Sequence, residues 1–79
     1  MVVVKILGSG CANCKRLEQI VRQVVEKENI EAEILKVTDY AEMMKYPILS
    51  TPGLVINEKL TSAGRIPKPE EVTGWLKAL

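Results

Sequence analysis

An apolar run rich in β-branched residues, Val2–Leu7, stands out at the start of the chain and predicts a strand, and Ala32–Val37, bounded by Asn29 and Asp39, predicts a second strand. The first run ends at Gly8-Ser9-Gly10, a flexible turn. A continuous apolar run of this kind is typical of an inner strand that is covered on both faces. Lys5 interrupts the run, and we therefore expect this lysine near a strand end or a sheet edge.

Another apolar run lies late in the chain and predicts one half of a hairpin. Leu54–Ile56 is followed by Asn57-Glu58 and then by the second strand, Lys59–Ala63. Because Asn57 tolerates the positive φ that a tight turn requires, the two strands are expected to pair in antiparallel fashion.

The residues between 11 and 28 have the period of an amphipathic helix. Apolar side chains recur three and four positions apart, while charged and amide side chains occupy the other face. Asn29 follows the last periodic residue and suits a left-handed C-terminal cap. The apolar face is predicted to consist of Leu17, Ile20, Val21, Val24 and Val25.

Two shorter helices are predicted further on. Asp39 has the character of an N-cap, and Glu42, three residues later, completes a capping box. The helix Tyr40–Lys45 must end before Pro47. Proline suits the first turn of a final helix, Pro69–Leu79, whose apolar stripe is expected to contain Val72, Leu76 and Leu79, with Trp75 beside it.

The predicted elements follow the order β-α-β-α-β-β-α, which is an α/β fold. The right-handed crossover rule makes the first two strands parallel neighbours, and the hairpin adds two antiparallel strands. We therefore expect a four-stranded mixed sheet flanked by three helices. With 79 residues, the chain is predicted to form a single domain spanning residues 1–79.

Composition and charge exclude several functions. The chain carries 11 Lys and Arg against 10 Asp and Glu, so it lacks the basic excess that nucleic-acid binding requires. No apolar run approaches the ~20 residues of a membrane span. The apolar segment Met1–Val4 is stopped by Lys5 and lacks the pattern of a signal peptide. We therefore expect a cytoplasmic protein without nucleic-acid or membrane partners.

The sequence contains two cysteines, in Cys11-Ala12-Asn13-Cys14, where the first strand passes into the long helix. A secreted domain of this size that depended on disulfides would carry four or more cysteines. Free backbone N–H groups and the helix dipole favour an anion at Cys11, which lowers the pKa of its thiol. Cys11 can then attack a substrate disulfide, and Cys14, less than one turn further on, can resolve the mixed disulfide.

The alternative is an inert or metal-binding pair, because soft thiolates at this spacing can hold copper or zinc. A structural zinc site needs four ligands, and the chain has two cysteines and no histidine. Zinc or an iron–sulfur cluster would therefore have to be shared by two chains. The position of the pair between a strand and a helix favours the redox interpretation, with no resident cofactor or metal.

A second signal, Ser50-Thr51-Pro52-Gly53, stands directly before the predicted strand Leu54–Ile56. A proline is allowed at the first residue of a strand, and on its own this one predicts an ordinary loop. After a cysteine pair, a helix, a strand and a second helix, the motif instead predicts a cis-proline that faces the disulfide. Backbone groups of Thr51 would then pair with an extended substrate.

These motifs together resemble the thioredoxin superfamily over nearly the whole chain, and most closely the small glutaredoxin-like thioredoxins of archaea and bacteria. That group has a minimal thioredoxin fold with a G-x-G-C-x-x-C start, a T/L-P-G before the hairpin and a Gly-Arg after it. The matching segments are Gly8–Cys14, Thr51-Pro52-Gly53 and Gly64-Arg65.

The resemblance implies a protein-disulfide reductase that takes part in electron transport and cell redox homeostasis. It also implies Cys11 as the nucleophile, Cys14 as the resolving thiol and Pro52 as the cis-proline. The expected substrate-binding residues are Gly10, Ala12, Asn13, Thr51 and Pro52.

Differences from ordinary glutaredoxins bear on the partners. The chain has Ala12-Asn13 between the cysteines, Thr51 before the proline, and no Gly-Gly-Asp for glutathione. We therefore expect electrons to come from a flavin-dependent, thioredoxin-reductase-like enzyme. Disulfide-containing proteins are the expected targets, and the carrier is expected to be a monomer.

The main rival is a heavy-metal chaperone of the ferredoxin-like fold, which also begins with a strand, a C-x-x-C motif and a helix. That family has a Met two residues before the first Cys, where this chain has Ser9. Its fold runs β-α-β-β-α-β and ends on a strand, whereas this chain places its hairpin late and is expected to end on a helix. These two differences favour the oxidoreductase.

Overall fold

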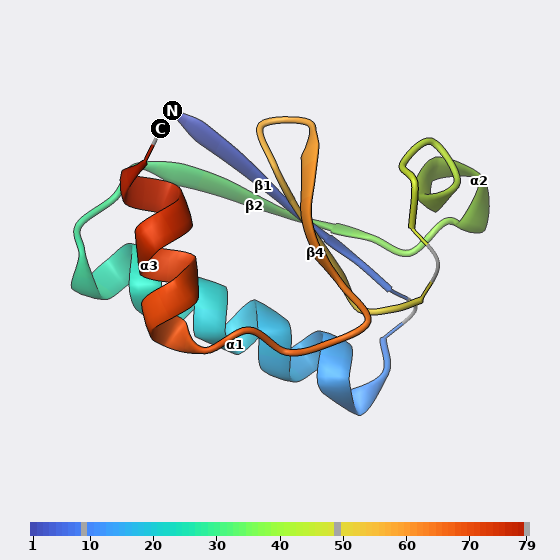
Figure 1. Cartoon of the computed structure of the whole chain (residues 1–79), viewed down its shortest axis with the longest axis horizontal. Coiled ribbons are helices and arrows are strands. Elements are labelled where there is room, and N and C mark those ends of the chain that lie inside the picture. The colour runs from blue at the N-terminus through green and yellow to red at the C-terminus, as the bar shows by residue number, and fades with distance from the viewer. Residues whose placement is uncertain (9, 49, 79) are drawn as a thin grey trace.

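The computed structural model describes residues 1–8, 10–48 and 50–78. Its elements follow the predicted order (Figure 1). Two predictions concern residues outside this description, Ser9 in the turn and Leu79 in the last helix. The elements are β1 (Val2–Leu7), α1 (Ala12–Lys27), β2 (Ala32–Val37), α2 (Tyr40–Met43), β3 (Gly53–Ile56), β4 (Lys59–Ala63) and α3 (Pro69–Lys77).

The strands form one sheet in the order β2-β1-β3-β4. β1 and β2 run parallel and remain in register up to the pair Leu7 and Val37. Because β3 pairs antiparallel with both β1 and β4, the predicted mixed sheet is confirmed. The turn between β3 and β4 has φ values of 49° at Asn57 and 68° at Glu58, the positive angles of a tight hairpin.

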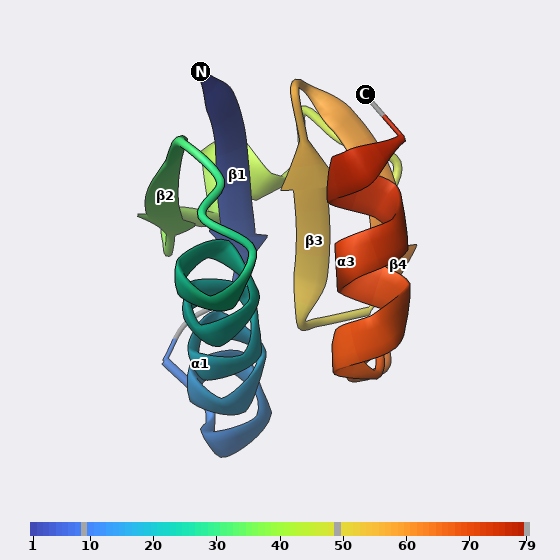
Figure 2. The same cartoon turned by 90° about the vertical axis from the view of Figure 1, so that its left-hand side faces the viewer.

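Helices α1 and α3 cover one face of the sheet, and α2 lies on the other (Figure 2). The main core forms between the sheet and these two helices, because alternate apolar residues of β1 and β3 point toward them. A smaller cluster of Leu7, Met43 and Val55 lies on the α2 face. The buried residues of the main core are Val4, Ile6, Leu17, Val21, Val24, Leu54, Ile56, Val72 and Leu76.

Local hydrogen bonds close both ends of α1. Cys11 is the N-cap, so the helix begins directly after the first cysteine. At the other end Asn29 takes a φ of 54°, as predicted. The N–H of Asn29 donates to Glu26, and the N–H of Ile30 donates to Val25, which completes a Schellman motif. The N-terminus of α1 thus follows the carboxyl end of β1 after a short turn.

The second helix ends two residues before the predicted Lys45. Asp39 is its N-cap, as predicted, and accepts a hydrogen bond from the N–H of Ala41. The predicted capping box is wrong, because the Glu42 carboxylate binds the Nζ of Lys45. A cation three residues along the chain is within reach of this carboxylate and replaces the backbone as its partner.

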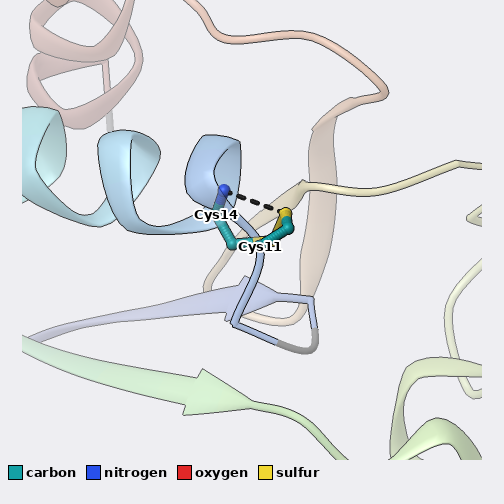
Figure 3. Close-up of a disulfide and its surroundings, with 2 residues drawn as sticks. All are labelled: Cys11 and Cys14. Atoms are coloured by element: carbon teal, nitrogen blue, oxygen red, sulfur yellow. Dashed lines mark hydrogen bonds between the residues drawn. A yellow bond between two sulfur atoms is a disulfide. The ribbon is translucent and has the colours of Figure 1, made fainter.

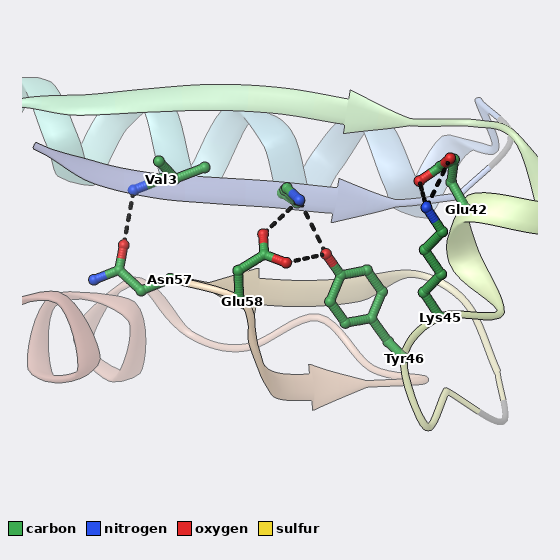
Figure 4. Close-up of polar contacts among 7 residues, drawn as sticks. Val3, Glu42, Lys45, Tyr46, Asn57 and Glu58 are labelled. Atoms are coloured by element: carbon green, nitrogen blue, oxygen red, sulfur yellow. Dashed lines mark hydrogen bonds and ion pairs between the residues drawn. The ribbon is translucent and has the colours of Figure 1, made fainter.

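The expectation for Lys5 is also wrong. Lys5 lies within an inner strand, opposite Leu35 on one side and Val55 on the other. Its Nζ forms an ion pair with Glu58 (2.5 Å) and donates to the hydroxyl of Tyr46 (3.0 Å). Figure 4 labels these two partners, Glu58 and Tyr46. The sheet tolerates this lysine because its charge is paired on the α2 face.

The last helix begins at Pro69, in the predicted position. Val72 and Leu76 are buried, and Trp75 is half-buried against the main core. Within the described residues, no helix has both the length and the apolar character needed to cross a membrane.

Candidate active site

Cys11 stands where the chain enters α1 (Figure 3). It has an extended backbone (φ −68°, ψ 164°), and its Sγ accepts a hydrogen bond of 3.1 Å from the N–H of Cys14. The helix starts with Ala12-Asn13-Cys14-Lys15, so no acidic side chain in its first turn offsets the positive potential of the helix dipole. A negative charge on the Cys11 sulfur is therefore stabilised by a backbone donor and by the helix dipole.

Cys11 and Cys14 form a disulfide, with their Cα atoms 5.0 Å apart. Their surroundings differ, because Cys11 is exposed and Cys14 is only 5% exposed. Another protein can therefore approach Cys11, whereas Cys14 is shielded by the fold. This difference fits the predicted order of attack.

Gly8 leaves the space that the Cys14 sulfur fills. A Cβ at this position would overlap Cys14 Sγ and would lie 4.0 Å from the Cβ of Thr51. Gly8 also donates its N–H to the carbonyl of Val37, which continues the pairing of the two parallel strands. The sequence indicates a flexible turn here, but the structure requires glycine for close packing. The contact with Cys14 links residues six positions apart and gives no local signal.

The peptide bond between Thr51 and Pro52 is cis, as predicted. Thr51 is exposed and Pro52 is buried. The carbonyl of Pro52 accepts a hydrogen bond of 3.0 Å from the N–H of Gly64, on the far side of the hairpin. Because β3 starts directly after Pro52 and runs antiparallel to β1, Thr51 comes to lie near the end of β1 and the disulfide.

The structure brings the predicted substrate-binding residues to one end of the sheet. Gly10, Ala12, Asn13 and Thr51 are exposed there, and Pro52 is buried. Gly10 has a φ of 81°, in the left-handed region that favours glycine. Their role in binding stays a prediction, although their exposure agrees with it.

A cavity of about 100 Å³ lies beside Cys14, between the start of α1 and the ends of β1 and β2. Glu18 and Lys36 both line it. The Glu18 carboxylate binds Arg22 (2.9 Å) and Lys36 (3.6 Å), and the hydrogen bond from Arg22 holds the pKa of Glu18 below its usual value. The sequence patterns did not predict this part of the site, although the four-residue spacing of Cys14 and Glu18 places the two side chains on the same helix face.

A larger cavity, of about 510 Å³, lies on the α2 face and includes Lys5, Tyr46 and Glu58. The Tyr46 hydroxyl donates to Glu58 (3.1 Å). The pKa of Glu58 is lowered, mainly by its hydrogen bond with Lys5 and next by the one with Tyr46. The pKa of Lys5 is raised, mainly by its hydrogen bond with Glu58 and next by the one with Tyr46. Because these groups satisfy one another, we interpret them as a structural link between β1, the loop after α2 and the hairpin turn.

The described residues contain no group of three or more His, Cys, Asp or Glu side chains that could hold a metal ion. The two cysteines are instead bonded to each other. Such a pair can accept and return two electrons by breaking and remaking its disulfide.

Comparison with known proteins gives consistent matches. A family model described as a thioredoxin domain matches residues 2–77. A thioredoxin of Methanocaldococcus jannaschii is 38% identical over 78 residues, which cover 99% of this chain and 90% of the relative. A thioredoxin of Methanothermobacter thermautotrophicus is 33% identical over 72 residues, which cover 91% of this chain and 94% of the relative.

A solved structure has the same fold. The crystal structure of Deadhead, a germline-specific thioredoxin of Drosophila melanogaster, matches with a TM-score of 0.69 at 20% identity. The match covers 99% of this chain and 80% of that chain. The sequence matches support the redox interpretation of the cysteine pair, and none of them favours the soft-metal carrier.

Proposed function

The chain belongs to the thioredoxin family and is a thiol–disulfide oxidoreductase, and on this premise we propose that Cys11 attacks the disulfide of a target protein and Cys14 releases the target. The observation that carries this order is the unequal exposure of the two cysteines. Attack rates depend on the thiolate fraction and on access, and the exposed position at the helix N-terminus favours Cys11 in both respects.

The proposed reaction moves two electrons to the target in two exchanges. The Cys11 thiolate attacks one target sulfur, and the other target sulfur leaves as a thiolate. The Cys14 thiol loses its proton and attacks Cys11 Sγ, which releases the first target sulfur as a thiolate. The target is then reduced, and the protein holds the Cys11–Cys14 disulfide.

Recognition of the target is assigned to the exposed residues at the same end of the sheet. We propose that the backbone of Thr51 pairs with an extended segment of the target, next to a surface formed by Gly10, Ala12 and Asn13. The exposure of these residues and the closeness of Thr51 to Gly8 support this assignment. The small side chains flanking Cys11 leave its sulfur open to a bulky partner.

The oxidised protein must be reduced again before another turnover. We propose a flavin-dependent, thioredoxin-reductase-like enzyme as the electron donor, because the sequence has no Gly-Gly-Asp for glutathione. We also propose that the protein acts as a monomer in the cytoplasm. Its targets would be disulfide-containing proteins.

Reduction of insulin disulfides tests this function. With dithiothreitol as the source of electrons, the protein should accelerate insulin precipitation, and either Cys11→Ser or Cys14→Ser should abolish the acceleration. A flavin reductase supplied with its nicotinamide cofactor should replace dithiothreitol, whereas glutathione should not. Full activity of Cys11→Ser would contradict the role of Cys11, and turnover that requires glutathione would contradict the proposed donor.

A further inference from the structure

Two exposed cations lie beside Cys11, on the first two turns of α1. The backbone N–H of Lys15 donates to the carbonyl of Cys11 at 3.0 Å, so Lys15 stands one helical turn after the exposed sulfur. Arg16 follows Ala12 by four residues, a spacing that makes two side chains neighbours on a helix surface. Within the described chain, neither cation belongs to an ion pair. Both charges are therefore available next to the surface to which we assign target recognition.

The other charges in this part of the fold do not cancel these two cations. Glu18, on the next turn of α1, is already bound by Arg22 at 2.9 Å and by Lys36 at 3.6 Å. Asp39, the N-cap of α2, adds a second carboxylate, which accepts a backbone N–H. The ion pairs within α2 and between Arg65 and α3 are each neutral in themselves. The disulfide end of the sheet therefore keeps a positive excess.

The size of this excess is large for the chain as a whole. Residues 11–22 and 36–39, which surround the disulfide, contain four cations and two carboxylates, namely Lys15, Arg16, Arg22, Lys36, Glu18 and Asp39. They carry two positive charges in excess, whereas the whole chain has a formal charge of +1, so the remainder is negative. The N-terminus of α1 adds the positive potential of the helix dipole at Cys11.

We propose that the protein reduces disulfides flanked by acidic residues in preference to disulfides flanked by basic ones, because Lys15 and Arg16 attract an acidic target segment to Cys11. The inference rests on the proposed attack by Cys11. Complementary charges speed the encounter of two partners and align them, whereas like charges brought together oppose binding. The bonds that form and break are those given above. The two cations thus determine specificity and take no part in the exchange itself.

Three synthetic peptides, each with one internal disulfide, test this preference. They differ only in the two residues beside one cysteine, which are both Glu, both Gln or both Lys. At an ionic strength of about 10 mM, where charges act over ~30 Å, we expect the reduced protein to react about tenfold faster with the Glu peptide than with the Lys peptide. At about 1 M, where the range is ~3 Å, the ratio of the two rate constants should fall to about one.

A pair of double variants assigns the preference to the cations beside Cys11. Combining Lys15→Gln with Arg16→Gln should reduce the low-salt ratio to about two, since the helix dipole remains. Combining Lys27→Gln with Lys59→Gln removes two exposed cations elsewhere and should leave the ratio at about ten. Because a changed pKa of Cys11 alters the rates with all three peptides alike, the ratio separates docking from the chemistry of the thiol.

The outcomes distinguish this inference from the function on which it rests. A ratio near one in the unaltered protein at low salt would overturn the inference and leave the reductase function intact. A tenfold ratio that persists without the cations of Lys15 and Arg16, or that does not respond to salt, would also overturn it. If none of the three peptides were reduced, the proposed function would fail, and this inference with it.

Discussion

Cys11 and Cys14 have different chemistry because the helix begins between them. Cys11 is the N-cap, and its sulfur accepts the backbone N–H of Cys14. Cys14 lies in the first helical turn and is buried against the end of β1, in the space left by Gly8. A charge on Cys11 is therefore stabilised by the helix terminus, whereas a charge on Cys14 is separated from solvent.

In the reduced protein, we predict that the pKa of the Cys11 thiol lies below the usual value for cysteine and that of Cys14 above it. Brief treatment with iodoacetamide, followed by mass analysis of the peptides, should show about tenfold faster modification of Cys11 near neutral pH. Repeating the measurement across a pH series gives both pKa values. Faster modification of Cys14 would reverse the roles assigned to the two residues.

Gly8→Ala should impair both stability and activity, because the added methyl group would overlap Cys14 Sγ. Overpacking of this kind costs roughly 1–3 kcal/mol in the free energy of unfolding. The displaced Cys14 should also resolve mixed disulfides more slowly. Denaturant unfolding measures the first effect, and single-turnover kinetics measure the second.

Gly74→Ala is the matched control for this substitution. Gly74 lies inside α3, and a Cβ there would meet no atom within 4 Å. Alanine should therefore stabilise the helix by about 0.5–1 kcal/mol and leave insulin reduction unchanged. If Gly8→Ala were tolerated as well as Gly74→Ala, close packing would not be the reason for glycine at position 8.

At the scale of the elements, the N-terminus of α3 is fixed to the loop before it by one carboxylate. Both terminal guanidinium nitrogens of Arg65 donate to Glu71, at 3.1 and 2.8 Å, and the backbone N–H of Lys68 donates to it at 3.1 Å. These contacts, with Arg65 first, lower the pKa of Glu71 to about 2. Glu71 thus satisfies a backbone group at the helix start while it holds the Gly64-Arg65 segment in place.

This contact should make α3 sensitive to acid. Because the pKa of Glu71 in the folded protein is below its ordinary value of 4.5, the contribution of the carboxylate is complete above about pH 4.5 and is lost as the pH falls toward about 2. Arg65→Gln should raise the pKa of Glu71 and weaken this pH dependence. A carbon NMR titration of Glu71 checks the pKa, with the exposed Arg16→Gln as the control. An unchanged pKa in Arg65→Gln would contradict this account.

The elements that could be predicted from the sequence depend on local patterns. Val2–Leu7 has the predicted bounds because it is a largely apolar run that ends at turn residues, and Ala32–Val37 has them because Asn29 and Asp39 mark the turns on either side of it. Asn29 and Asn57 adopt the predicted positive φ for the same local reason. The capping box at Glu42 could not be excluded in this way, because the sequence does not show which of two nearby donors a carboxylate will bind.

Features that depend on contacts between elements could not be predicted. Lys5 stays in an inner strand because Glu58 and Tyr46 reach it from two other parts of the chain. In the same way, the cavity beside Cys14 exists only once β2 and α1 meet, which brings Lys36 to Glu18. The cysteine pair and the cis-proline were accessible from motifs and from family resemblance, but the residues that support them were not.

At the scale of the whole molecule, the fold places the disulfide at one end of a thin sheet. The helices and strands contribute residues to two apolar clusters, one on each face, and β1 and β3 contribute to both. Because these two strands join the clusters, we propose that residues 1–79 form one domain that unfolds as a unit.

Cooperative unfolding tests this proposal. Trp75 packs against the main core, so its fluorescence reports the docking of α3, while far-ultraviolet circular dichroism reports the whole backbone. We predict that both signals change at the same urea concentration, as in a two-state transition. An earlier change in fluorescence would show that α3 separates from the rest of the fold before the sheet unfolds.

The most direct test of the central claim, attack by Cys11 and release by Cys14, is to trap the mixed disulfide. Cys11→Ser and Cys14→Ser are each incubated in reduced form with a disulfide-containing protein such as insulin, and the products are analysed by mass spectrometry without reductant. We predict that Cys14→Ser accumulates a covalent complex through Cys11, because no nearby thiol resolves it, and that Cys11→Ser accumulates none. Accumulation of a complex through Cys14 in Cys11→Ser, with none in Cys14→Ser, would contradict the mechanism.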